Sequence, residues 1–425
     1  MTSAPPPASP QGDIESRYAW MRLMVALTVV TIGNVGMYAA SIVLPSIQAD
    51  FGVSRGGASL PYAATMLGFG LGGIFMGRLA DRFGVFVPVV LGAVGIGLGL
   101  MLASMADTIV TFNLVHGLVI GLLGSSALFS PLVADTSLWF TRRRGIAVAI
   151  CMCGNYLAGA VWPPVMQHFV VPFGWRHTYM GVGAFCLVTL LPLALCIRRR
   201  PPSIEVTLPN TVDTQTRPGR PVPGDRPLGL APNTAILLLC IAGVGCCVAM
   251  AMPQVQIVAY CTDLGYGATN GANMLSLMLT TGIISRLASG WISDRIGGLR
   301  TLLLGSLLQG LALWLYLFNQ GLLPLYVVSA LFGLFQGGIV PAYAVIVREH
   351  FPAQGTGVRV GVVLMATLVG MALGGWMSGL IYDMTLSYWA AFANGIAWNL
   401  LNTAIVVFLL YKSRGLPAQW RRRMA

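Results

Sequence analysis

Hydrophobic residues occur in long blocks along this chain, and short polar or charged segments separate the blocks. Twelve blocks of about 20 residues or more cover 22–48, 58–78, 85–105, 109–134, 145–170, 175–197, 232–260, 271–292, 300–319, 323–347, 357–382 and 388–411. A helix of about 20 residues crosses the roughly 30 Å hydrocarbon core of a bilayer. The strict alternation of transmembrane strands is absent. The pattern therefore predicts an all-α membrane protein with twelve transmembrane helices.

The composition excludes other classes of protein. Hydrophobic residues make up 56% of the 425 residues and charged residues only 9%, against roughly 25% charged in an ordinary soluble domain. A chain with so little charge cannot cover itself with a water-facing surface. A soluble enzyme, a nucleic-acid binder and a disordered protein are therefore ruled out, and we expect the lipid bilayer to surround the molecule.

The positions of the basic residues predict how the helices are oriented. Twelve spans place both termini on one side, and 22 of the 25 Lys and Arg residues fall on that side. Only Arg55 and Arg176 lie on the opposite side. Because basic residues collect on the cytoplasmic side, both termini should be cytoplasmic. Lys412 is the only lysine, which favours a GC-rich bacterial genome and hence the bacterial cytoplasmic (inner) membrane.

A polar, proline-rich segment at 198–231 interrupts the hydrophobic pattern, and we interpret it as a flexible cytoplasmic linker. It separates a six-helix bundle at 19–197 from a second at 232–412. Residues 1–18 form a predicted disordered cytoplasmic tail, and residues 413–425 a basic cytoplasmic tail. The eight cysteines fall mostly in spans. Their spacing supports neither a disulfide nor a metal site, and we expect no cofactor.

The two halves repeat one another in sequence. One motif occurs twice, 213 residues apart, first as Gly77-Arg-Leu-Ala-Asp81-Arg82-Phe-Gly84 and then as Gly290-Trp-Ile-Ser-Asp294-Arg295-Ile-Gly297. The same offset relates Asp50-Phe-Gly52 to Asp263-Leu-Gly265. Glycine suits a tight loop between helices. The Asp can face a helix N-terminus and the Arg can pair with carboxylates, so each loop can latch one conformation. Internal repeats of six helices are common in membrane transporters.

The repeated motif resembles the signature loop of the major facilitator superfamily, and length, span count and linker agree with that family. The stretch Trp139-Phe140-Thr-Arg-Arg143-Arg144-Gly-Ile-Ala147 is similar to the entry of the fifth helix in its monocarboxylate transporter branch. The resemblance implies two pseudo-symmetric bundles around a central substrate site, no enzymatic activity, and symport of protons with a small carboxylate.

Arg286 lies well inside a predicted span, whereas the other Lys and Arg residues lie at span ends or between spans. A charge inside a span costs about 2.5–3.5 kcal/mol on insertion scales, so it needs a partner or a function. Small and polar residues share its helical face, whereas Leu277, Ile284, Leu287 and Trp291 lie opposite, so Arg286 should face protein or a cavity. The alternative is a structural role, with the side chain reaching to the nearby cytoplasmic end of the helix.

The resemblance implies that Arg286 binds the carboxylate of the substrate, because the monocarboxylate branch places an Arg in this helix. That family often adds an Asp one turn earlier, where this chain has Gly282, and a Lys in the first helix, which this chain lacks. Neutral polar residues at mid-span depth complete the predicted substrate site: Asn34, Tyr38, Asn155, Gln336 and Tyr343. Interhelical hydrogen bonding is the alternative for each.

The sequence thus predicts a monomeric secondary transporter for a small organic anion, most readily a monocarboxylate. Proton symport has no relay residue that we can name, so anion exchange stays open. Two other cargoes also remain, a dicarboxylate in exchange or a hydrophobic compound in export. A single intramembrane Arg favours one carboxylate over two. A membrane receptor would need a soluble output domain, and the longest soluble stretch here is the linker.

Overall fold

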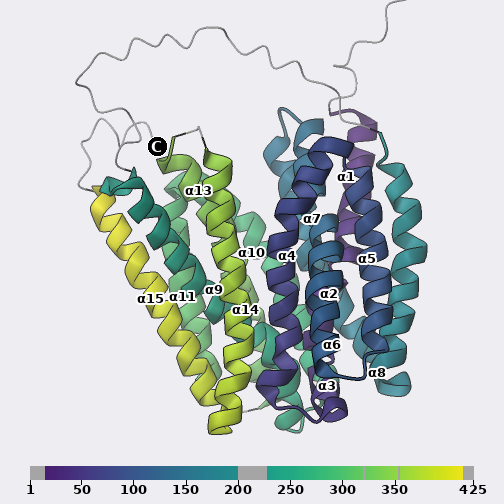
Figure 1. Ribbon diagram of the computed structural model, residues 1–425. Helices are drawn as coiled ribbons and strands as arrows, with labels where there is room; N and C mark the ends of the chain where they lie inside the picture. The colour runs from purple at the N-terminus through teal and green to yellow at the C-terminus, as the bar shows by residue number, and fades with distance from the viewer. Residues whose placement is uncertain (1–14, 200–226, 319–320, 353–354, 415–425) are drawn as a thin grey trace, which may run out of the picture.

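The computed structural model describes residues 15–199, 227–318, 321–352 and 355–414, and nearly all of them are helical (Figure 1). The first half contains α1 (Arg17–Gly33), α2 (Val35–Ile42), α3 (Leu44–Phe51), α4 (Arg55–Phe83), α5 (Phe86–Ser104), α6 (Ile109–Leu114), the π-helix η2 (Val115–Ser125), α7 (Ser126–Trp139) and α8 (Arg144–Cys196). The second half contains the short 3₁₀-helix η3 (Pro227–Gly229), α9 (Pro232–Asp263), α10 (Ala268–Ile296), α11 (Gly298–Leu317), α12 (Leu322–Gln336), α13 (Ile339–His350), α14 (Thr356–Thr385) and α15 (Tyr388–Arg414).

Eleven helical segments among the described residues are long and apolar enough to cross a membrane. One of them, α8, has 53 residues, which would be roughly 80 Å long if straight, more than twice the hydrocarbon thickness. It breaks at Gly174, whose backbone lies at φ 76° and ψ 166°. Because α8 covers both the predicted span 145–170 and the predicted span 175–197, the eleven segments account for the twelve predicted spans.

The helices form two groups that stand side by side (Figure 1). The first bundle contains α1 to α8, and the second contains α9 to α15. They meet along two seams, where α4 lies against α14 and α8 lies against α10. The predicted linker (198–231) and the two predicted tails fall largely outside the described residues.

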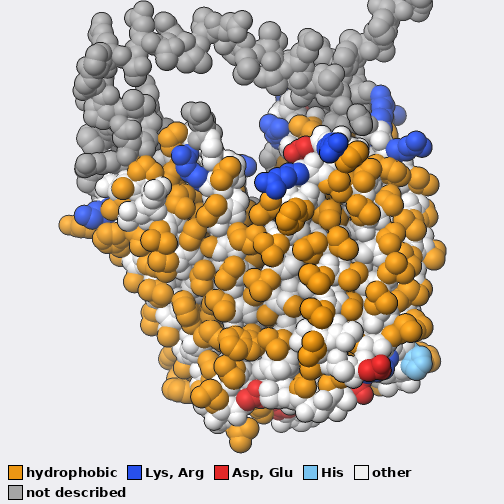
Figure 2. All heavy atoms as spheres, viewed as in Figure 1, with side chains coloured by type: hydrophobic (Ala, Val, Ile, Leu, Met, Phe, Trp, Pro, Cys, Tyr) orange, Lys and Arg blue, Asp and Glu red, His pale blue; other side chains and the backbone are white. Residues whose placement is uncertain are grey.

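The outer surface is that of a membrane protein. Hydrophobic side chains cover most of the face shown in Figure 2, while Lys and Arg gather at one end and Asp, Glu and His also appear at the other end. The first of these, where α1 begins and α8 ends at Cys196, we call the linker end, and the opposite one the far end. The space-filling surface is notched between the two bundles at the linker end. This apolar band confirms the all-α membrane fold that the sequence predicts.

The sequence repeat is also a repeat in backbone conformation. Gly84 and Gly297 end the two copies of the motif, and both adopt φ 83°, with ψ values of 168° and 160°. Gly52 and Gly265 likewise share positive φ angles, at 62° and 80°. These conformations favour glycine because an L side chain is strained there. The paired glycines therefore give the helix-to-helix turns of the two halves the same shape.

Candidate functional site

Arg286 projects from α10 into the seam between the bundles, where it meets α8. Its Nη1 donates a hydrogen bond to the backbone oxygen of Met152 at 3.3 Å, and its Nε donates to that of Gly337 at 3.5 Å. The guanidinium carbon lies 4.4 Å from the centroid of the Tyr156 ring, which is a cation–π distance. The side chain is half-buried. Arg286 therefore faces protein rather than lipid, as its helical face predicts.

The opposite face of α10 forms part of the outer surface. Ile284, Leu287 and Trp291 are each more than half exposed, at 58%, 53% and 58%. Large apolar side chains exposed together on one face of a helix are suited to contact with lipid. The helix thus presents apolar groups outward and its single interior charge inward.

No described Asp or Glu forms an ion pair with Arg286. The described carboxylates that do form ion pairs have Arg22, Arg55, Arg176 or His350 as their partner. Its two hydrogen bonds to backbone oxygens are long and therefore weak. A guanidinium carries five N–H donors, so Arg286 retains donors for a further acceptor. A positive charge at this depth without a counter-charge is a site where an anion would be stabilised.

Asp135, a buried carboxylate of the first bundle, is held by a different arginine. Its Oδ2 accepts a hydrogen bond from Nε of Arg22 at 3.0 Å, and both residues are buried. The Arg22 guanidinium also lies 4.8 Å from the Trp139 ring. This ion pair joins α1 to α7 within one bundle, so Asp135 is already neutralised and does not compensate Arg286.

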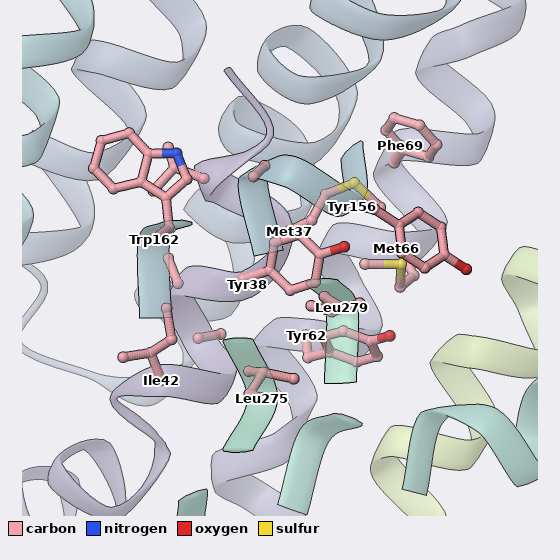
Figure 3. Packing of buried hydrophobic residues seen from close by; sticks show 14 of the residues in the cluster. Met37, Tyr38, Ile42, Tyr62, Met66, Phe69, Tyr156, Trp162, Leu275 and Leu279 are labelled. Carbon is pink, nitrogen blue, oxygen red and sulfur yellow. The ribbon is translucent and has the colours of Figure 1, made fainter. Parts of the chain in front are cut away.

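Tyr38 and Asn155 are brought together beside the seam. The Tyr38 hydroxyl lies 3.2 Å from the backbone oxygen of Asn155 and 3.3 Å from its Oδ1. Figure 3 shows the rings of Tyr38, Tyr62 and Tyr156 close to Leu279, which α10 contributes from the second bundle. Two of the predicted site residues, Tyr38 and Asn155, thus lie beside Tyr156, whose ring contacts Arg286.

Asn34 and Gln336 are fully buried and incompletely hydrogen-bonded. Asn34 lies at the junction of α1 and α2, and neither atom of its side-chain amide has a partner within the described chain. Gln336 precedes Gly337, which accepts the hydrogen bond from Arg286. Its Oε1 accepts from Gln254 at 3.2 Å, while its Nε2 is unpartnered among the same residues. Buried amides are normally satisfied, so both have capacity for a ligand or water.

Tyr343 is placed differently from the other predicted site residues. Its hydroxyl donates a hydrogen bond to Oδ1 of Asn402 at 3.0 Å, and the side chain is fully buried between α13 and α15. It is not among the groups that contact Arg286. Because α12 ends at Gln336 and α13 begins at Ile339, Gln336 and Tyr343 lie on separate helices.

The sequence reasoning missed a cluster that joins the two bundles at the far end. Arg55 begins α4 and is buried. Its Nη2 lies 2.8 Å from Oδ2 of Asp263 in the second bundle, and its Nη1 donates to the Tyr388 hydroxyl at 2.9 Å. The Tyr388 hydroxyl in turn donates to the same Asp263 oxygen at 2.5 Å. We call Arg55, Asp263, Tyr388 and Asp383 the far-end seal.

Asp383 completes the far-end seal by capping a helix of the other bundle. Its Oδ1 and Oδ2 accept the backbone N–H groups of Arg55 and Gly56, both at 2.7 Å. These are the first N–H groups of α4, which have no partner within their own helix, and the helix dipole favours an anion there. The carboxylate on α14 thus fixes α4 across the seam.

A second polar layer lies directly inside the far-end seal. Gln256 of α9 donates from its Nε2 to the Ser59 hydroxyl of α4 at 3.0 Å and to the Ser378 hydroxyl of α14 at 3.2 Å. The backbones also approach closely, since a Cβ added at Gly379 would lie 2.8 Å from the Arg55 oxygen. The far end is therefore closed by charge, hydrogen bonds and contact between backbones.

The repeat contains the signal that could have revealed this cluster. Asp50 stands 213 residues before Asp263, and Trp175 the same distance before Tyr388. In the first bundle the Trp175 Nε1 donates to Asp50 at 3.1 Å, just as Tyr388 donates to Asp263 in the second. Each bundle thus has an aspartate held by its own aromatic residue, and the second copy also binds Arg55.

The chemistry of these clusters is that of binding rather than catalysis. Within the described ranges, no group of three or more His, Cys, Asp or Glu side chains could hold a metal ion. All eight cysteines are free thiols. The seam contains the cation of Arg286, the buried amide of Gln336 and the aromatic ring of Tyr156. Groups of these kinds are suited to bind an organic anion.

Comparison with known proteins agrees with this architecture. The sequence matches the family model described as "Major Facilitator Superfamily" over residues 24–318 and 237–423. The chain belongs to the major facilitator superfamily. It is 28% identical to Monocarboxylate transporter 13 of Bos taurus, over 78% of this chain and 75% of that protein. It is 25% identical to the MFS-type transporter pynF of Aspergillus niger, over 83% of this chain and 78% of that protein.

Solved structures share the superfamily fold. A peptide transporter, POT, crystallised in complex with sulfate, superimposes with a TM-score of 0.71 at 14% identity, covering 92% of this chain and 94% of that one. Members of this superfamily are not enzymes, and this chain is accordingly a multi-pass membrane transporter of a small-molecule substrate. The relatives named above come from a fungus and a mammal.

The two signature loops of the superfamily are disengaged at the linker end. Asp81, Arg82, Asp294 and Arg295 are all exposed, and in the described parts of the chain none of them forms an ion pair. A Cβ added at Gly77 or Gly290 would meet no atom within 4 Å. The latch function predicted for these loops stays a prediction, but in this conformation the bundles are held together at the far end.

Proposed function

We propose that this superfamily member is a secondary transporter that moves a small organic anion, a monocarboxylate, between its two bundles. One observation carries the proposal: the Arg286 guanidinium lies in the seam with no carboxylate partner among the described residues, held by backbone oxygens and an aromatic face. The names of the monocarboxylate transporters among its relatives support the same cargo.

Arg286 is suited to anchor the cargo. Its planar guanidinium is always charged and can bind one carboxylate through two parallel hydrogen bonds. A dicarboxylate would need a second cation near Arg286. Arg22 does not supply it, because its guanidinium is paired with Asp135. The spare amide groups of Asn34 and Gln336 can meet further polar atoms of the cargo.

The asymmetry of the two ends supports alternating access, in which the bundles rock about a central site. The far-end seal is formed in the conformation described here, whereas the signature loops are exposed and the surface is notched at the linker end. By the distribution of Lys and Arg this end is cytoplasmic. Binding of a carboxylate would neutralise Arg286, and the seam could then close around a site without net charge.

The test is uptake by the purified protein in proteoliposomes. The probes are radiolabelled acetate, L-lactate and benzoate, with succinate as the dicarboxylate. We expect uptake of at least one monocarboxylate, and a loss of about 10- to 100-fold in Arg286→Ala, because a hydrogen-bonded charge contributes about 1.5–3 kcal/mol. Arg286→Lys should also be impaired, because an ammonium lacks the planar fork.

Arg348→Ala is the matched control, since it removes an exposed arginine of the second bundle. Wild-type uptake by both Arg286 variants would refute the assignment, as would movement of succinate alone. An imposed pH gradient then decides the coupling. Symport predicts faster uptake with the outside acidic and co-movement of protons, whereas exchange predicts dependence on an anion inside.

A further inference from the structure

The ring of Tyr156 occupies a space that exists only because α10 has a glycine there. A Cβ added at Gly282 would lie 2.6 Å from Cδ1 of Tyr156 and closer still to Cε1. Carbon atoms that are not bonded make their best contact at about 3.5–4.0 Å, so this ring position excludes any side chain at 282. Gly282 lies one helical turn before Arg286 on the same face. The aromatic ring therefore covers the turn of α10 next to the guanidinium.

The same stretch of α8 also supports the guanidinium directly. The Tyr156 ring lies 4.4 Å from the guanidinium carbon of Arg286. The backbone oxygen of Met152, one turn earlier on α8, accepts its Nη1–H at 3.3 Å. A long arginine side chain has many rotamers, and restricting them before binding reduces the entropy that the ligand must overcome. Two contacts from one helix provide that restriction.

We infer that Tyr156 is a positioning residue for the anion site: its ring orients Arg286 toward the cargo, and Gly282 provides the space that the ring requires. This inference rests on the proposed function. An aromatic face attracts a cation through its quadrupole without cancelling the charge. A carboxylate in the same place would neutralise the guanidinium. The tyrosine thus holds Arg286 while leaving its full charge for the substrate.

The two residues come from different bundles, so the site is shared. Tyr156 belongs to the first bundle and Arg286 to the second, and Ser276 of α10 adds a hydrogen bond to the backbone of Ala160 on α8. The orientation of the guanidinium accordingly depends on how the bundles sit relative to each other. Substrate affinity should change between the two orientations of the transporter, because rocking moves the ring away from or toward the cation.

The test separates positioning from folding through the kinetic constants of uptake. Tyr156→Phe keeps the ring and should leave KM for the transported probe, L-lactate or benzoate, within about twofold of wild type. Tyr156→Leu removes the ring and should raise KM about tenfold, with a smaller change in maximal rate. Tyr316→Leu is the control, because Tyr316 is equally buried in α11 and bonds Ser329, away from Arg286; it should leave KM unchanged.

Gly282→Ala provides an independent second variant. Its methyl group should displace the ring and raise KM as Tyr156→Leu does. In a Tyr156→Ala background the same change should add nothing, because the clash is gone. Gly181→Ala, at a glycine of α8 with no atom within 4 Å, controls for glycine replacement. Thermal unfolding in detergent identifies any variant that is merely misfolded.

The outcomes distinguish the two proposals. If Arg286→Ala abolishes uptake while Tyr156→Leu and Gly282→Ala keep the wild-type KM, the positioning role is wrong and the proposed function stands. If Arg286→Ala transports normally, or no monocarboxylate is moved, both are wrong. A higher KM in Tyr156→Phe equal to that in Tyr156→Leu would also overturn the inference, because the hydroxyl rather than the ring would then be responsible.

Discussion

Two asparagines show how differently a buried amide can be used in this protein. Asn402 and Asn34 are both fully buried. Asn402 accepts from Tyr343 and donates from its Nδ2 to Ser306 at 2.7 Å, whereas Asn34 has no partner for either amide atom in the part of the chain that is described. An unsatisfied buried polar group costs about 1–3 kcal/mol. Such a group is expected where function, rather than stability, maintains it.

Alanine replacement should therefore affect the two asparagines in opposite ways. We expect Asn402→Ala to lower the free energy of unfolding by about 1–3 kcal/mol, because it leaves Tyr343 and Ser306 unpaired. Asn34→Ala should leave thermal stability unchanged or higher but reduce monocarboxylate uptake. Thermal unfolding in detergent and proteoliposome uptake measure the two effects. Equal destabilisation of both variants would show that Asn34 has a structural partner.

For single residues, the sequence predicted which side chains lie inside the spans better than it predicted their hydrogen-bond partners. Arg286 could be singled out because a charge inside a span is rare, and its inward direction followed from the helical wheel. The role of Tyr343 could not be judged in that way, because its partner Asn402 is 59 residues away and a wheel does not identify the neighbouring helix. Arg55 was noted only for its side of the membrane.

Tight turns with matching backbone angles connect equivalent helices in the two bundles. Gly84 and Gly297 both adopt φ 83° with extended ψ, a region that only glycine occupies readily. In addition, the N–H of Gly297 bonds the Ser293 oxygen at 2.9 Å, and that of Gly84 bonds the Ala80 oxygen at 2.8 Å. Each turn thus ends one helix and starts the next in a fixed direction.

Replacing either turn glycine should cost stability to a similar extent. We expect Gly84→Ala and Gly297→Ala each to lower the free energy of unfolding by about 1–3 kcal/mol through backbone strain. Gly181→Ala, inside α8 and facing open space, should be neutral or slightly stabilising, because Ala favours helix by up to about 1 kcal/mol. Thermal unfolding of the three variants in detergent measures these changes in stability. A tolerated Gly84→Ala would mean that the turn can adopt another conformation.

The helices themselves were the most predictable level of structure. Each predicted span falls largely within a helical segment, because a bilayer requires long apolar helices. The break of α8 at Gly174 falls between the predicted spans 145–170 and 175–197, because each crossing of the bilayer needs a helix of its own. The subdivision of the first span at Asn34, by contrast, depends on packing rather than on hydrophobicity.

The two ends of the molecule are in different states. At the far end, Arg55, Asp263, Tyr388 and Asp383 hold α4 against the second bundle, while at the linker end the signature loops make no ion pair within the described ranges. The side-chain contacts of Arg55 with the second bundle join residues 208 and 333 positions apart. Sequence patterns within one span carry no information on pairs so distant, which is why the far-end seal was not predicted.

Weakening the far-end seal should expose the layer beneath it. Ser59 is fully buried between the bundles, so Ser59→Cys should react slowly with a membrane-impermeant maleimide added at the far end. Adding Asp263→Asn removes the charge that binds Arg55. We expect the labelling rate to rise about 5- to 30-fold, the equivalent of 1–2 kcal/mol.

Asp50→Asn is the matched control for this measurement. Asp50 is the equivalent of Asp263 in the repeat, but its side-chain partners among the described residues, Trp175 and Arg176, belong to its own bundle. It should not change the labelling of Ser59→Cys. If both replacements raised the rate equally, general loosening rather than loss of the seal would be responsible.

A closed far end also sets how the carrier behaves when it is empty. If most unloaded molecules rest with the seal formed, a solute arriving from that side meets only the small fraction that happens to be open, and its apparent affinity falls in proportion to that fraction. The apparent affinity for a solute that approaches from the linker end is not lowered in this way. The half-saturating concentrations for entry and exit should then differ, and loosening Asp263 should bring them closer together.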